Sequence, residues 1–255
     1  MLPGLAFVAA VGVTVAVFAG SDEPVLVDTD AVAEEPASPA AETVDDAPSA
    51  ERMRPLRLPE DSTMAVGDPD APVVMVAFES FDCLWCGHMH TRTLPSVMTD
   101  YVDAGLLRIE ARMLPYEPAA APGARIGAAA GLQDRYWEVA KHLYPFIAGA
   151  GAPPLGRDLT DAELGAYRER QTEDALLGEV LRVADEIDLD WDRFFADYES
   201  EEVEAIVARD ATLARQLGFT GTPAMVINGV PVGGFRSEDT FRDLLDGVLA
   251  ATTAE

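Results

Sequence analysis

Cysteine is nearly absent from this 255-residue sequence, which has only Cys83 and Cys86, separated by two residues. Two cysteines exclude the disulfide-dense scaffolds of many small exported domains. Basic residues are also few: 18 stand against 45 acidic ones, and Lys141 is the one lysine, so the net charge is −27. A surface this negative repels nucleic acid and anionic lipid headgroups, and we expect no nucleic-acid partner.

Phosphate-binding loops are missing too. Neither the DPDAP stretch nor the glycines near Ala150 have the spacing of a phosphate loop, and there is no flavin or nucleotide motif. We therefore expect no cofactor and no bound metal. The chain is 49% hydrophobic, which suffices to fill a core.

The N-terminal segment, residues 1–20, is strongly apolar. Leu2 to Gly20 carry no charge, and nineteen residues of helix span roughly 28 Å, near the thickness of a bilayer core. The segment fits a secretory signal, with a cleavage site at Val17–Ala19, or an uncleaved anchor. We prefer the anchor, and the alternative to both is a buried soluble helix. The acidic residues that follow favour export of everything downstream.

Residues 21–60 form an acidic stretch with repeated alanine and proline and eleven acidic residues. Such a composition buries too little apolar surface to offset the entropy of ordering the chain. We predict a disordered linker here, with the folded domain beginning near Met64.

The pattern beyond Met64 predicts a small sheet domain with a helical insertion. The apolar run 73–78 is typical of a buried central strand, and Asn228-Gly229 between two apolar runs indicates a hairpin. The predicted strands are 73–78, 106–114, 224–227 and 230–232, and the predicted helices are 89–102 with a kink at Pro95, 125–147, 161–168, 173–187, 191–198, 201–217 and 237–249. Thr160, Ser200 and Ser237 are candidate N-caps, and Gly218 a C′ glycine.

The cysteine pair allows three interpretations. A structural disulfide across four residues removes little chain entropy, worth roughly 2 kcal/mol. A metal site would add His88 and His90, but on one helix His88 points away from the other three side chains. A redox pair needs Cys83 at the N-terminal end of a helix, where free N–H groups and the positive end of the helix dipole favour a thiolate. Cys86, one turn further, is then suited to resolve a mixed disulfide, and we prefer this interpretation.

Three blocks of the chain resemble the DsbA-like thiol–disulfide oxidoreductases of the thioredoxin superfamily. They are GDPDAPVVMVAFESFDCLWCGHMHTRTLPSVMTDYVDAGLLRIEARMLPY, ARIGAAAGLQDRYWEVAKHLY and IDLDWDRFFADYESEEVEAIVARDATLARQLGFTGTPAMVINGVPVGGF. The resemblance implies an α/β, thioredoxin-like fold, with residues 64–116 and 218–250 forming the thioredoxin-like domain and residues 117–217 an all-helical insertion.

The same resemblance implies that Thr222-Pro223 is a cis-proline loop that faces the cysteines and pairs with an extended client peptide. Pro223 then belongs to the catalytic site with Cys83 and Cys86, and Gly221 permits a close approach. The alternative is an ordinary trans-proline turn before a strand.

Two departures from the family concern the redox centre. Leu84 stands between the cysteines where the family often has proline, and Ala77 stands where it often has a buried acid. Glu79 lies two residues on, on the same face of a strand. We expect Glu79 to handle the proton of Cys86, and the alternative is a solvent-exposed Glu79.

Other side chains near the pair have weaker assignments. We expect Trp85 and Phe81 to line an apolar surface where unfolded clients dock, or else to be plain core. His88 either tunes the thiolate as a nearby cation or lies exposed. His142 lies on a helix face with no partner that the sequence identifies.

These features predict an exported thiol–disulfide oxidoreductase of the cell envelope, anchored by residues 2–20 or secreted after cleavage. Its partners would be exported client proteins that contain cysteine and, by resemblance, a membrane protein that reoxidises it; we expect a monomer. The alternatives are a disulfide reductase or isomerase, and a non-enzymatic, chaperone-like binding module.

Overall fold

The computed structural model describes residues 53–252, apart from residues 55, 61, 116–120 and 150–157. The predictions for the apolar segment 1–20 and for the linker up to residue 52 lie outside these residues. Among the helices in the described part of the chain, none combines the length and the hydropathy of a membrane span.

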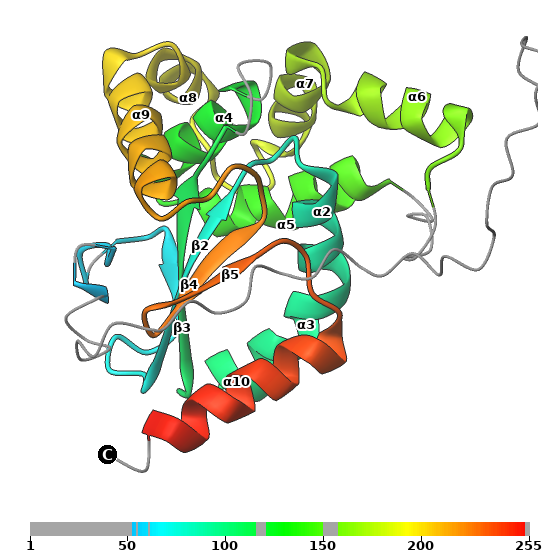
Figure 1. Cartoon of the computed structure of the whole chain (residues 1–255). Helices are drawn as coiled ribbons and strands as arrows, with labels where there is room; N and C mark the ends of the chain where they lie inside the picture. The colour runs from blue at the N-terminus through cyan, green and yellow to red at the C-terminus, as the bar shows by residue number, and fades with distance from the viewer. Residues whose placement is uncertain (1–52, 55, 61, 116–120, 150–157, 253–255) are drawn as a thin grey trace, which may run out of the picture. The chain divides into compact units, whose positions relative to one another are not determined.

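A five-stranded mixed sheet forms the centre of the fold (Figure 1). Its strands are β1 (Ala65–Val66), β2 (Val73–Glu79), β3 (Leu107–Met113), β4 (Ala224–Ile227) and β5 (Val230–Gly233), in the order β1-β3-β2-β4-β5. The central strand β2 is parallel to β3 and antiparallel to β4. Four of the five strands match the predicted ones. We missed β1 because two half-buried residues carry no periodic pattern.

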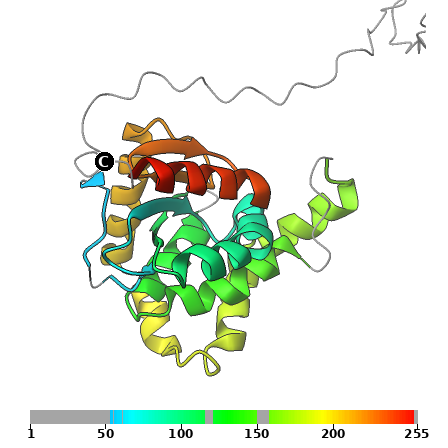
Figure 2. The ribbon, with the colours of Figure 1, turned by 90° about the horizontal axis from the view of Figure 1, so that it is seen from below.

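Helices cover the sheet and form the insertion. They are α2 (Leu84–His88), the π-helix η1 (Met89–Thr93), α3 (Leu94–Val97), the π-helix η2 (Met98–Val102), α4 (Ala121–Gly131), α5 (Tyr136–Ala148), α6 (Asp161–Arg170), α7 (Glu173–Val183), α8 (Trp191–Tyr198), α9 (Glu201–Gln216) and α10 (Glu238–Thr252). Helices α3 and α10 lie side by side (Figures 1 and 2). The helices α4 to α9 between β3 and β4 are the predicted helical insertion.

Every residue of β2 is buried, as expected for a strand covered on both faces. Val73, Met75 and Ala77 pack with Phe241 and Leu245 of α10 on one face. On the other face, Val74, Val76 and Phe78 of β2 pack with Ala211 and Ala214 of α9. The sheet is therefore sandwiched between α10 and α9.

The helical stretch that follows the cysteines is less regular than predicted. In place of one kinked helix over 89–102, two π-helical segments alternate with short α-helices. Pro95 lies in the first turn of α3, directly after η1. Proline has no N–H to donate and its ring displaces the preceding turn, so the change of helix type at this point has a local cause.

Helix boundaries in the insertion follow local signals. Thr160 caps α6 in a capping box, Ser200 caps α9, and Gly218 after α9 has a φ of 79°. The predicted helix 125–147 is wrong as a single element, because Asp134 adopts a φ of 61° and the chain turns between α4 and α5. The predicted helix 173–187 ends earlier, at Val183.

The predicted disordered linker is wrong for its last residues. Met53 and Leu56 are buried against the α9 face of the sheet. The reason is β3, where Arg108, Glu110 and Arg112 are all buried. Buried charges need partners. The segment supplies them: the Arg57 guanidinium lies 2.7 Å from Glu110, the Leu58 N–H donates to Glu110, and the Leu56 carbonyl accepts from Arg112.

Candidate functional site

Cys83 occupies the position that a redox thiol requires. Strand β2 ends at Glu79, and Cys83 is the N-cap of α2. Its sulfur accepts a hydrogen bond from the Cys86 N–H at 3.2 Å and donates to the Thr222 carbonyl at 3.4 Å. Both cysteines are free thiols.

The surroundings favour the thiolate form of Cys83. Burial alone would raise its pKa, but hydrogen bonds from Cys86, from Thr222 and from the backbone N–H of Cys86 together lower it, while the charge of Asp82 opposes them. The Thr222 hydroxyl has no other partner among the described residues, so it is free to donate to this sulfur.

Cys86 has the opposite character. It is completely buried. Burial raises its pKa well above that of an ordinary thiol, the hydrogen bond and charge of Cys83 raise it further, and the charge of Glu79 adds to the effect. The pair therefore consists of one thiol that ionises readily and one that holds its proton.

Glu79 is buried, so the solvent-exposed alternative is wrong. Its carboxylate oxygens both lie 3.0 Å from Nε2 of His90. It also accepts hydrogen bonds from the hydroxyls of Tyr136 at 3.0 Å and Tyr144 at 3.1 Å. Burial by itself would raise the pKa of Glu79, but His90 and the two tyrosines lower it below the usual range, so the group is a carboxylate.

Sequence reasoning missed most of this network. Tyr136 and Tyr144 were not singled out, and His90 was considered only as a metal ligand. The spacing of the two tyrosines in YWEVAKHLY could have indicated them, since Tyr136 and Tyr144 are eight residues apart and residues at this spacing share one face of a helix. The Tyr144 ring stacks on His90, with centroids 3.7 Å apart and planes 20° apart, and this fixes the imidazole beside Glu79.

The aromatic residues near the cysteines divide into core and surface. Phe81 is fully buried and packs against Tyr136 and Tyr144, so its prediction as a client-docking surface residue is wrong and the core alternative holds. Trp85 is 46% exposed, as a docking residue must be, and its ring lies near those of His88 and Phe235.

His88 is buried, so the exposed alternative for it is wrong. Burial and the charge of Arg92 lower its pKa, which favours the neutral ring. The hypothesis that His88 stabilises the thiolate as a cation therefore gains no support. Its Nδ1 makes no hydrogen bond within the described residues.

The loop that carries Cys83 is tied to the helical insertion. The Asp82 carbonyl accepts hydrogen bonds from the Tyr167 hydroxyl and the Gln171 amide, both at 2.9 Å. The Tyr167 hydroxyl accepts in turn from the Leu84 N–H at 3.2 Å. A side chain from α6 therefore binds the backbone on both sides of Cys83.

The peptide bond between Thr222 and Pro223 is cis, as the resemblance implies, and strand β4 begins at the next residue. The Thr222 carbonyl faces the Cys83 thiol, so the two segments meet although 139 residues separate them. Close packing does not require a glycine at position 221, since a Cβ there would meet nothing within 4 Å.

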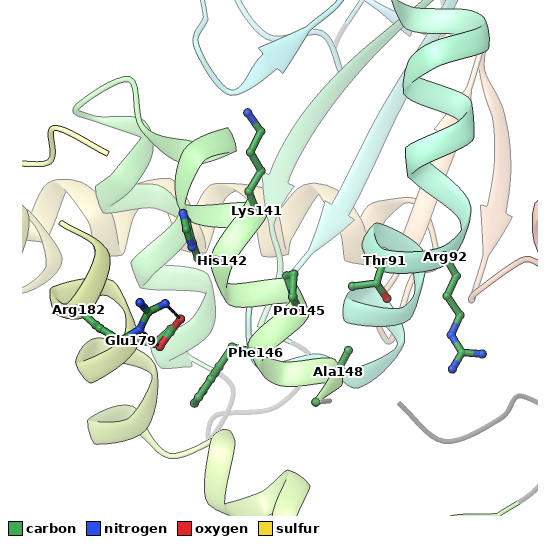
Figure 3. Close-up of a pocket in the computed structure, with 10 residues that line it drawn as sticks. Thr91, Arg92, Lys141, His142, Pro145, Phe146, Ala148, Glu179 and Arg182 are labelled. Atoms are coloured by element: carbon green, nitrogen blue, oxygen red, sulfur yellow. Dashed lines mark hydrogen bonds and ion pairs between the residues drawn. The ribbon is translucent and has the colours of Figure 1, made fainter. Parts of the chain in front are cut away.

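A pocket of about 640 Å³ lies between η1, α5 and α7 (Figure 3). Its lining includes Lys141 and Arg92, whose side chains point in different directions in Figure 3, and the paired Glu179 and Arg182. His142, also in the lining, has a distant partner in Glu186 at 4.0 Å. Neither cysteine lines this pocket, so it is separate from the redox centre.

Comparison with known proteins places this geometry in a family. The thioredoxin family Thioredoxin_4 matches residues 60–247. The Na(+)/H(+) antiporter NhaA 3 of Salinispora tropica is 28% identical over 166 residues, which cover 64% of this chain and 21% of the antiporter. The match to the curated relatives thus spans about a fifth of their length.

Solved structures share the fold. The alpha-DsbA1 of Wolbachia pipientis superposes with a TM-score of 0.59 at 22% identity, covering 78% of this chain and 95% of that one. Oxidised BdbD of Bacillus subtilis gives a TM-score of 0.56 at 16% identity, covering 80% and 96%. The predicted α/β fold with a helical insertion is confirmed. Because the thioredoxin family model matches most of the length of this chain, the chain belongs to that family, and it has the fold of the DsbA-like oxidoreductases.

Proposed function

We propose that this chain is a thiol–disulfide oxidoreductase in which Cys83 exchanges disulfides with client proteins and Cys86 resolves the mixed disulfide. The observation that carries the proposal is the position of the Cys83 sulfur. It lies at the N-cap of α2, within 3.2 Å of the Cys86 N–H, opposite the Thr222 carbonyl. The N–H of Cys86 and the N-terminal end of the helix stabilise a thiolate at Cys83, the cysteine of the pair that is not completely buried.

The direction that the site favours is disulfide donation. A client thiolate attacks the Cys83 sulfur of the Cys83–Cys86 disulfide, the bond between the two breaks, and Cys86 leaves and takes up a proton. A second client thiolate then attacks the client sulfur of the mixed disulfide, and Cys83 leaves as a thiolate. The client loses two electrons and the pair gains them. A lowered pKa makes Cys83 a good leaving group and stabilises the reduced protein.

Three further residues would contact the client or serve the exchange. Trp85 offers exposed aromatic surface next to Cys83, and an extended client segment would pair with the backbone at Thr222 and Pro223. Glu79 would handle the proton of Cys86, because its charge acts on that thiol from a buried position.

The partners that we propose are exported proteins that contain cysteine, together with a membrane protein that reoxidises the pair. An extracytoplasmic location suits this chemistry, because disulfides persist in oxidising compartments. The apolar stretch Leu2–Gly20 suits export or anchoring.

Equilibration of the purified protein with a glutathione buffer series tests the proposal. We expect a potential more oxidising than that of glutathione, loss of client oxidation in Cys83→Ser, and accumulation of mixed disulfide in Cys86→Ser. A potential below that of glutathione would instead support a reductase. If Cys83→Ser still promoted the refolding of a reduced client, the chain would be a chaperone-like binding module and the proposal would fail.

A further inference from the structure

We infer that His90 is the solvent-side end of a proton route that serves Cys86 through Glu79. This inference rests on the proposed redox function and adds a positioning residue to it. The motivating observation is a buried carboxylate whose two oxygens both face one imidazole. The tyrosines that donate to this carboxylate pack in one core cluster with the buried thiol of Cys86, which must gain and lose a proton in each cycle.

The geometry gives the route a direction. The Glu79 side chain is 2% exposed, whereas that of His90 is 11% exposed, so the imidazole is the part of the pair that reaches water. The ring cannot turn away freely, because Tyr144 stacks on it at 3.7 Å. A proton that arrives on Glu79 therefore has a neighbouring base already at hydrogen-bond distance.

The proton balance explains why Cys86 needs such a route. In the reduced protein burial raises the pKa of Cys86 most, and the hydrogen bond and charge of Cys83 raise it further. The two contributions of Cys83 disappear when Cys83 is bonded to a client sulfur. Cys86 then releases its proton, which passes to Glu79 and on to Nε2 of a His90 ring that carries its own proton on Nδ1. The Cys86 thiolate attacks Cys83 and displaces the client thiolate. In disulfide donation the proton travels the opposite way, from water to the leaving Cys86.

The other groups that face this carboxylate do not compete for the proton. Tyr136 and Tyr144 of α5 donate hydrogen bonds to Glu79, and burial raises the pKa of both well above the ordinary value, so they stay protonated. Cys86 of α2 acts on it through its charge, and its own titration is part of the reaction. The remaining partner is the imidazole of His90, whose Nε2 lies at hydrogen-bond distance from both carboxylate oxygens.

The test is the pH profile of mixed-disulfide resolution in the full chain carrying His90→Gln. The protein would be joined through Cys83 to a small thiol, and the release of that thiol followed over a range of pH. Proton transfer by a positioned side chain contributes about 10²–10⁴-fold, so we expect release to slow at least about tenfold near neutral pH, with a changed pH profile. Alkylation of Cys83 in the reduced protein should keep its wild-type pH dependence. His142→Gln, on α5 but outside the network, is the matched control and should behave as wild type.

A wild-type profile in His90→Gln would overturn the inference while leaving the redox function intact. An inert Cys83 in the wild-type protein would instead overturn the redox function itself. If His90→Gln fails to fold, Glu79→Gln replaces it, because the amide keeps a carbonyl for the tyrosine hydroxyls but cannot take up the proton. A wild-type profile in that variant would refute the route equally.

Discussion

Gly87 sets how closely the redox helix packs on the helical insertion, and its replacement by alanine measures that packing. A Cβ at Gly87 would lie 2.8 Å from Cγ2 of Ile147, 2.9 Å from the Tyr144 carbonyl oxygen and 3.2 Å from the Ala148 nitrogen. Two of these atoms are backbone and cannot rotate away. Overpacking of this kind costs about 1–3 kcal/mol, and alanine in a helix returns about 0.5–1 kcal/mol. We therefore expect a net loss of up to about 2.5 kcal/mol.

Urea unfolding of the reduced protein measures this difference. Gly165→Ala in α6 and Gly178→Ala in α7 are matched controls, because a Cβ at either glycine would meet nothing within 4 Å. Both controls should gain up to about 1 kcal/mol. If Gly87→Ala gained as much as they do, the close contact between α2 and α5 would be refuted.

Three further substitutions test other contacts. Arg112→Met removes the guanidinium 2.7 Å from the buried carboxylate of Asp210 and leaves that of Arg209 at 3.3 Å, so unfolding in urea should show a loss of about 3 kcal/mol; a change under 1 kcal/mol would contradict this. Tyr167→Phe removes the hydroxyl that binds the backbone on both sides of Cys83 and should cost about 1–2 kcal/mol by the same method, whereas an unchanged midpoint would mean that the loop is held elsewhere. The lowered pKa of Glu79 contributes stability that is present above the unfolded value of 4.5 and is lost as the pH falls through the folded value. Glu79→Gln should therefore flatten the dependence of the melting temperature on pH below 4.5, and parallel curves for the two proteins would disprove the shift.

Local patterns in the sequence suffice for four strands of the sheet and for the redox pair. The run 73–78 predicts β2 because a strand covered on both faces is apolar throughout, and Asn228-Gly229 predicts the hairpin because both residues adopt positive φ. The position of Cys83 at the N-terminal end of a helix can be predicted because the cysteine pair directly follows a predicted strand. Each of these signals lies within a few residues, so one sequence carries it completely.

Contacts between distant segments are what the sequence could not supply. The buried charges of β3 attract the segment 53–58, but its composition alone resembles that of the linker before it. Glu79 could be placed on the correct face of β2, yet its partners Tyr136 and Tyr144 lie more than 50 residues away. Only the folded chain shows which of these polar groups meet.

The helical insertion holds the redox centre from two directions. Cys83 and Cys86 belong to the same hydrophobic core as helices α4, α5, α7 and α8 of the insertion, whereas β2 packs mainly with α10 and with α9, the last helix of the insertion. Tyr167 fixes the backbone beside Cys83, and Tyr144 fixes the partner of the carboxylate that acts on Cys86. These two contacts come from different helices of the insertion, Tyr167 from α6 and Tyr144 from α5. Changes in the insertion should therefore alter the chemistry of the cysteines even where the sheet remains intact.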